Sequence, residues 1–95
     1  MKELCKTFFK MDGKIIDGYK VTEENGRYCI HVYTSCKRLG NWQEFLHYDD
    51  LNKVIKYFKR SVDRDITERQ VETEWVIAEN KWRKQTLDLL LAIND

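Results

Sequence analysis

The sequence predicts an α+β fold: a four-stranded antiparallel meander over about residues 5–48, followed by two helices packed on one sheet face. Three observations support this. All four glycines lie at or before position 40, proline is absent, and the apolar period changes from two to about 3.6 after Tyr48. Ninety-five residues with 42% apolar composition make one domain, with a β-rich half over 1–48 and a helical half over 49–95.

The clearest hairpin signal is Asn25-Gly26 between two alternating segments. A type I′ turn needs positive φ at both central residues, which this pair tolerates. A two-residue loop pairs Tyr19 with Val32 and places apolar side chains on one face. The other, polar face then carries Lys20, Thr22, Glu24, Arg27, Cys29 and His31.

Asp12-Gly13 predicts an earlier hairpin that joins residues 5–11 to residues 14–16. Its register conflicts with the next hairpin, because strict alternation would send Phe9 to the face opposite Tyr19. One extra residue in a strand reverses the alternation. We therefore expect a β-bulge at Asp17-Gly18.

A turn near Leu39–Asn41, around Gly40, leads into a last strand over 42–48, and a first helix over about 50–62 follows. Asp49 is the expected N-cap, with Asp50 in the first turn. Apolar residues at helical spacing form one stripe: Leu51, Val54, Ile55, Phe58 and Val62.

Asp65, with Glu68 three residues later, predicts the start of a second helix over about 66–94. An unbroken helix of this length measures about 42 Å, longer than the roughly 32 Å diameter of a compact domain this size. The overhanging end is a candidate surface for a partner or for homodimerisation, and a bend near Asn80, an elongated chain or a frayed end are the alternatives. For the tryptophans, core packing against the sheet is the favoured role and an anchor for a partner is the alternative. The candidate residues are Trp75, Trp82, Leu89 and Ile93.

Cysteine usage and the N-terminus predict a cytoplasmic protein. The three cysteines are an odd number without a C-x-x-C pair, which favours reduced thiols over a disulfide framework. Met1–Lys6 lacks the apolar core of a signal peptide, and no apolar run approaches the length of a membrane span. We expect no membrane association.

The sequence predicts no catalytic, cofactor or metal site. Cys29 and His31 lie two apart on the polar face and could meet one ligand, but we expect His47 to be remote because it is on another strand. The paired aspartates Asp49 and Asp50 are interpreted as helix-capping residues, not as metal ligands. We therefore expect a protein that is not an enzyme and acts by binding.

Basic side chains recur along the first helix opposite its apolar stripe. This basic face comprises Lys53, Lys56, Arg60 and Arg64, with Tyr57 beside them and Lys37 and Arg38 in a nearby loop. Such a row attracts phosphates or acidic protein surfaces, and a solvated helix face paired with carboxylates is the alternative. The net charge of +1 predicts no strong preference for either partner class.

The leading hypothesis is a protein-binding module, an inhibitor or adaptor that occludes a partner's surface. Small lysine-rich proteins without catalytic motifs are typical of phage and mobile-element accessory proteins, such as inhibitors of bacterial defence nucleases; this step is an analogy with a class. The alternative is a nucleic-acid-binding accessory protein that uses the basic face of the first helix.

Overall fold

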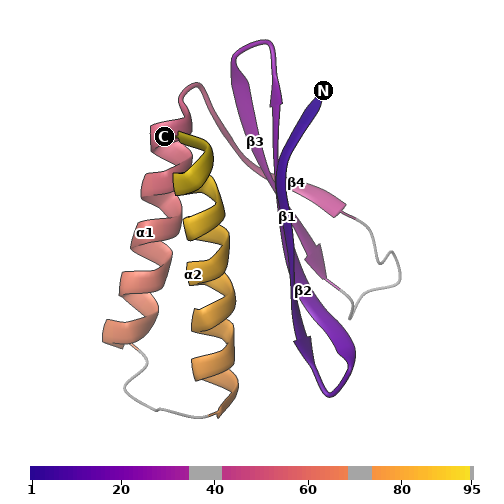
Figure 1. Cartoon of the computed structure of the whole chain (residues 1–95), viewed down its shortest axis with the longest axis vertical. Coiled ribbons are helices and arrows are strands. Elements are labelled where there is room, and N and C mark those ends of the chain that lie inside the picture. Colours follow the sequence, from indigo (N-terminus) through magenta and orange to yellow (C-terminus); the bar gives the residue numbers. More distant parts are fainter. Residues whose placement is uncertain (35–41, 69–73, 95) are drawn as a thin grey trace.

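The fold is a four-stranded antiparallel sheet with two helices on one face, as the sequence predicts (Figure 1). The computed structural model describes residues 1–34, 42–68 and 74–94, and the side chains of residues 34 and 63–68 lie outside that description. The sheet order is β1-β2-β3-β4. The elements are β1 (Lys2–Met11), β2 (Lys14–Glu24), β3 (Arg27–Thr34), β4 (Trp42–Tyr48), α1 (Leu51–Glu68) and α2 (Glu74–Asn94).

Two tight turns define the registers of the first three strands. Asn25 and Gly26 have φ of 54° and 78°, and Asp12 and Gly13 have φ of 52° and 76°. Both pairs have the positive φ at two successive residues that type I′ turns require. The predicted β2–β3 register is confirmed, and the polar face predicted for this hairpin is the sheet face turned away from the helices.

The predicted bulge exists, but its position differs from the prediction. Lys10 pairs with Ile15 and Phe9 pairs with Asp17, so the extra residue is Ile16 rather than a residue of Asp17-Gly18. Ile16 packs against the core, and this burial favours the bulge one position earlier. The turn predicted around Gly40 lies outside the described residues.

The predicted break between the two helices lies earlier in the chain than the break in the structure. α1 continues to Glu68, so Asp65 lies within this helix and does not begin the next one. An Asp followed three residues later by Glu is weak as a start signal here, because both types also occur within helices and no glycine or proline stops α1. The cap of α1 is Asp50, not Asp49, since the Asp50 carboxylate accepts the Asn52 backbone N–H at 2.9 Å.

α2 is correspondingly shorter than predicted. Its 21 residues span about 32 Å, which fits within molecular extents of 40 × 32 × 19 Å. The expectation of a helix of about 42 Å that overhangs its own domain is therefore wrong. The reason is that the predicted segment is divided between two elements, since residues 66–68 belong to α1 and α2 begins at Glu74.

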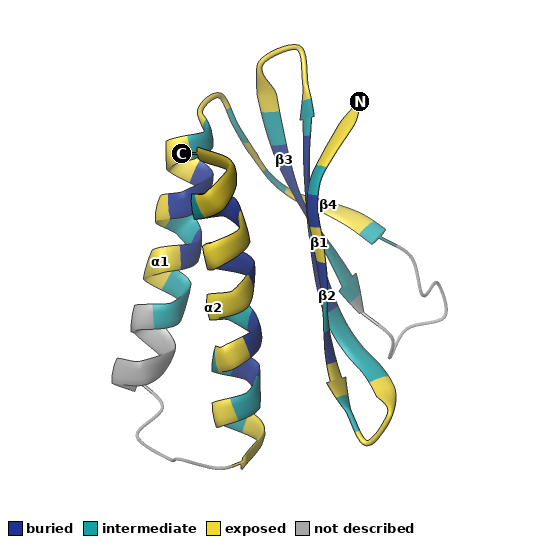
Figure 2. Ribbon diagram, viewed as in Figure 1, coloured by how far each residue is buried: buried dark blue, intermediate teal, exposed yellow. Residues whose placement is uncertain are grey.

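The core lies between the sheet and the two helices, where Figure 2 shows buried residues on the facing sides. α2 packs on β1, and α1 lies beside α2 and over β3 and β4. Trp82 is the centre of the α2 contact, stacked on Tyr19 with ring centroids 4.5 Å apart and on Phe9 at 5.6 Å. Fully buried aliphatic and aromatic side chains complete this layer: Val21, Ile30, Val54, Phe58 and Leu90.

Candidate functional site

Of the predicted basic face, the structure describes three cationic side chains on α1. Lys56 and Arg60 are exposed one turn apart. Lys53 forms an ion pair with Asp49 at 2.7 Å, and this hydrogen bond raises the pKa of Lys53 and lowers that of Asp49. Tyr57 is half-buried against the rings of Phe45 and Phe58. Lys37, Arg38 and the side chain of Arg64 lie outside the described part of the structure.

The predicted partner residues of α2 fall into two groups. Trp82 is only 6% exposed, and its indole N–H donates to Thr7 Oγ1 at 3.0 Å, so the core alternative is confirmed for this residue. Trp75, Leu89 and Ile93 are each more than 40% exposed. Trp75 and Ile93 stand near opposite ends of the helix, about 27 Å apart along its axis. These three residues do not form one patch, and their role in binding stays a prediction.

A more closely grouped set of aromatic, charged and polar side chains lies on one face of the sheet. In the described structure α1 and α2 leave this face uncovered, and we call it the open face (Figure 1). Its side chains come from all four strands. They are Lys6, Phe8, Gly18, Lys20, Thr22, Cys29, His31, Tyr33, Trp42, Glu44 and His47. Sequence reasoning identified only the part of this face contributed by the β2–β3 hairpin.

Four residues of the open face form a single row across the sheet, here called the aromatic row. Phe8 pairs with Gly18, Gly18 with Tyr33, and Tyr33 with Trp42. The Phe8 and Trp42 centroids are 5.6 Å apart, although β2 and β3 lie between their strands. Glycine makes this contact possible, because a Cβ on Gly18 would come within 2.9 Å of the Trp42 ring and 3.1 Å of Phe8.

Two lysines border the aromatic row. Lys6 and Lys20 pair with each other in the adjacent row, and their Nζ atoms lie 5.9 and 4.9 Å from the centroid of Trp42. Ammonium groups at such distances are attracted to the negative face of an indole ring. The three rings are half-buried, so a substantial aromatic surface stays accessible beside two cations.

Toward the Asn25-Gly26 turn, the open face becomes polar. His31 is 8% exposed, and its Nε2 shares a 2.9 Å hydrogen bond with Thr22 Oγ1. Burial, and then the charge of Lys20, lowers the pKa of His31, which favours the neutral imidazole. This pair links β2 and β3 without an exposed charge.

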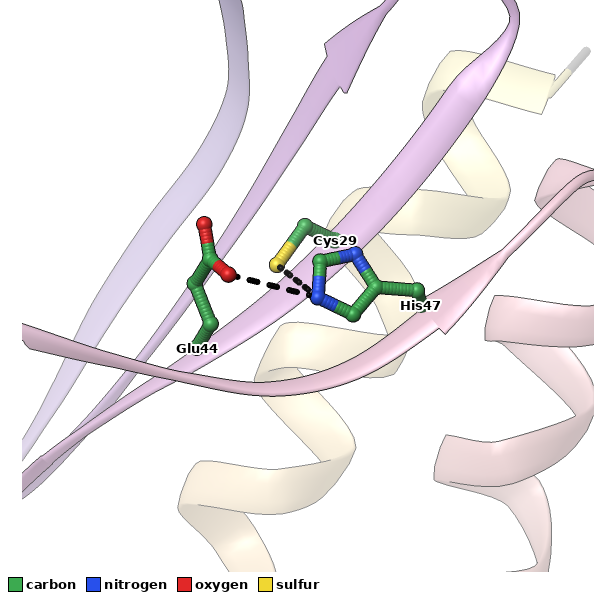
Figure 3. Close-up of side chains that lie close together, drawn as sticks. All are labelled: Cys29, Glu44 and His47. Carbon is green, nitrogen blue, oxygen red and sulfur yellow. Dashed lines mark hydrogen bonds and ion pairs between the residues drawn. The ribbon is translucent and has the colours of Figure 1, made fainter.

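Next to it, Cys29 and Glu44 both approach the same atom, Nε2 of His47 (Figure 3). The Cys29 Sγ lies 3.9 Å and the Glu44 Oε2 lies 3.3 Å from that nitrogen. The expectation that His47 is remote from Cys29 is wrong. β4 pairs with β3, and this pairing places the two residues directly opposite each other. Cys29 is 8% exposed, whereas Glu44 and His47 are exposed.

The geometry of this trio differs from that of a nucleophilic relay. In a relay, the thiol and the orienting carboxylate contact different nitrogens of the imidazole. Here both approach Nε2, so the three groups converge on one point. Burial, and then the negative charge of Glu44, raises the pKa of the Cys29 thiol, the opposite of what activates a nucleophile.

Comparison of the chain with protein-family models, with curated proteins and with solved structures finds no match. Neither helix of the described structure combines the length and apolar character that crossing a bilayer requires. The candidate site is therefore defined by its geometry. It consists of an aromatic row with two lysines and, beside it on the same open face, the convergent Cys29–Glu44–His47 trio.

Proposed function

We propose that this chain is a non-enzymatic protein-binding module and that its partner docks on the open face over the aromatic row. The observation that carries the proposal is the contact of Trp42 with Phe8 across Gly18. Trp and Tyr are enriched among the few residues that supply most of the affinity of protein interfaces. Here they stand on strands of a hydrogen-bonded sheet whose other face packs on the core, which limits the entropy lost on binding.

The side chains around the aromatic row suggest the chemistry of the partner. Lys6 and Lys20 place two cations at its border, and the row itself offers apolar rings. A complementary surface would carry an apolar side chain flanked by carboxylates, because opposite charges at a rim steer association and set orientation. An inhibitor or adaptor that acts by occlusion fits this arrangement, since such a protein needs only a surface that binds its partner.

A protein partner is favoured over single-stranded nucleic acid by two features. The rings of the aromatic row are inclined to one another, with interplanar angles of 86°, 52° and 53°, and do not form parallel platforms for successive bases. The net charge of +1 gives little long-range attraction for a phosphate backbone. Lys53 on α1 is already engaged by Asp49, which weakens the alternative of nucleic-acid binding by the basic face.

The proposal is tested by differential capture from a lysate of the native host, with and without nuclease treatment. The baits are the wild type, Trp42→Ala and Lys20→Glu, with Trp75→Ala as the matched control on α2. We expect a nuclease-resistant protein partner that the wild type and Trp75→Ala both retain. Loss of a hot-spot side chain costs about 2 kcal/mol or more, so Trp42→Ala should weaken binding at least about thirtyfold.

Two results would contradict this assignment. Equal capture of the same proteins by Trp42→Ala and by the wild type would remove the open face from the interface. Capture that disappears on nuclease treatment, together with retardation of single-stranded oligonucleotides by the purified chain, would assign the protein to the nucleic-acid alternative. Circular dichroism of each bait confirms that the variants are folded.

A further inference from the structure

We propose that Cys29 Sγ, His47 Nε2 and a Glu44 carboxylate oxygen form a zinc-binding site at the polar end of the open face (Figure 3). Thiolate, imidazole and carboxylate are the three side-chain ligand types that zinc takes in proteins. Their donor atoms all lie within 4.8 Å of one another. The site is independent of the protein partner proposed above, and either proposal can fail without the other.

The distances in the trio resemble those around a tetrahedral ion. Bonds of about 2.3 Å to sulfur and about 2.0–2.1 Å to nitrogen and oxygen place sulfur about 3.6 Å and oxygen about 3.3 Å from the nitrogen. In the structure the sulfur–nitrogen distance is 3.9 Å and the oxygen–nitrogen distance is 3.3 Å. The sulfur and the carboxylate oxygen lie within 4.8 Å of each other, against about 3.6 Å around a tetrahedral ion, so the side chains must rotate toward one another for all three bonds to form.

The backbone produces this convergence through a β-bulge in β4. On a regular strand, Glu44 and His47 would point to opposite faces, because they are three residues apart. The pairing of β4 with β3 shifts by one residue between Ile30 and His31, so Phe45 is the extra residue and both side chains reach the open face. Bulges that redirect a side chain are enriched next to functional sites.

The charges of the trio balance those of a divalent cation. On binding, the Cys29 thiol releases its proton to solvent and a sulfur–zinc bond forms. One thiolate, one carboxylate and a neutral imidazole then neutralise Zn²⁺ completely.

The fourth coordination position would face solvent. Cys29, Glu44 and His47 line a pocket of about 430 Å³ together with Thr22 and His31, among other residues. Three protein ligands and one open position, filled by water, form a common zinc arrangement. His31 is not included in the ligand set, because its Nε2 is engaged with Thr22.

The test is titration of the reduced full-length chain with Co²⁺, which replaces zinc and reports thiolate ligation. We expect a thiolate-to-cobalt charge-transfer band in the near ultraviolet and visible bands of four-coordinate intensity, both abolished by stoichiometric Zn²⁺. Cys29→Ser should remove the charge-transfer band, and His47→Gln should weaken Co²⁺ binding at least tenfold. Cys5→Ser is the matched control, since Cys5 is buried on the core side of the sheet and should leave the spectrum unchanged.

Several outcomes would overturn the proposal: no charge-transfer band from the wild type, a band that survives in Cys29→Ser, or a band lost in Cys5→Ser. If Cys29→Ser fails to fold, Glu44→Gln and His47→Gln provide the test, because both side chains are exposed and neither supports the core. Unchanged Co²⁺ affinity in both of these variants would exclude the ligand set.

Discussion

Replacing Thr86 by valine tests how α2 is attached to the sheet. Thr86 is completely buried, and its hydroxyl donates to the Trp82 carbonyl oxygen at 3.1 Å. The Thr86 hydroxyl has one proton, and that proton is used in the bond to the Trp82 carbonyl. Thr7 must therefore be the donor in the 2.7 Å contact between the two threonine hydroxyls. Thr7 Oγ1 in turn accepts the Trp82 indole N–H at 3.0 Å. The chain of donors therefore runs in one direction, from the indole to the Trp82 carbonyl.

The magnitudes follow from the groups that each change leaves unpaired. Thr86→Val keeps the shape but leaves the buried Thr7 hydroxyl without its acceptor, which costs about 1–3 kcal/mol. Thr7→Val leaves the indole N–H without an acceptor and Thr86 Oγ1 without a donor, so its cost should be the larger. In the double variant only the indole N–H is unpaired, and its cost should be close to that of Thr7→Val alone. We therefore expect a coupling energy equal in size to the cost of Thr86→Val, about 1–3 kcal/mol.

Urea denaturation of the wild type, both single variants and the double variant measures this coupling directly. Each 1 kcal/mol also corresponds to a shift of about 4–8 °C in Tm for a domain of this size. Costs that add to within about 0.5 kcal/mol, or a stabilising Thr86→Val, would refute the directional hydrogen-bond chain. An unchanged slope of free energy against urea concentration confirms that the comparison concerns native-state interactions.

Three further predictions concern other parts of the fold. Gly18→Val should displace Trp42 from the aromatic row and destabilise the chain by about 1–3 kcal/mol, seen as a change in tryptophan fluorescence and a lower urea midpoint; an unchanged spectrum would contradict the contact. Burial raises the pKa of Cys5 from 9.0 to about 11, so the stability present below pH 9 should decline toward pH 11, because only the unfolded chain releases the proton. Cys5→Ala should lessen that decline by about 1–2 kcal/mol in urea titrations, and parallel pH profiles would refute the shift. Glu79→Gln should cost roughly 1–3 kcal/mol by removing the buried carboxylate that pairs with Arg83, and a neutral effect would contradict the pair.

The parts of the fold that the sequence predicts well are specified by local rules. Asn25-Gly26 permits one turn type, and the turn sets the β2–β3 register along its whole length. The apolar stripe of α1 repeats at helical spacing, and its residues Val54, Ile55 and Phe58 are buried in the core. The boundary between α1 and α2 was harder to place, because the sequence between Val62 and Glu74 contains no glycine or proline.

The candidate site depends on pairings that are not local. β3 and β4 are joined by a longer connection than a two-residue turn, so no turn chemistry determines that Cys29 lies opposite His47. The bulge at Phe45 follows from this pairing and cannot be inferred from alternation within β4. The aromatic row likewise depends on three strand registers together, those of β1 with β2, of β2 with β3 and of β3 with β4. The available signal was Gly18, whose lack of a side chain indicates close approach by a neighbour.

The central claim, that a partner covers the open face, is tested most directly by hydroxyl-radical footprinting of the captured complex. Radicals oxidise accessible aromatic side chains, so the free chain and the complex can be compared residue by residue. We predict that binding protects Tyr33 and Trp42 while Trp75 on α2 stays as reactive as in the free chain. Protection of Trp75 with unchanged reactivity of Trp42 would contradict the account and place the interface on the helical side of the molecule.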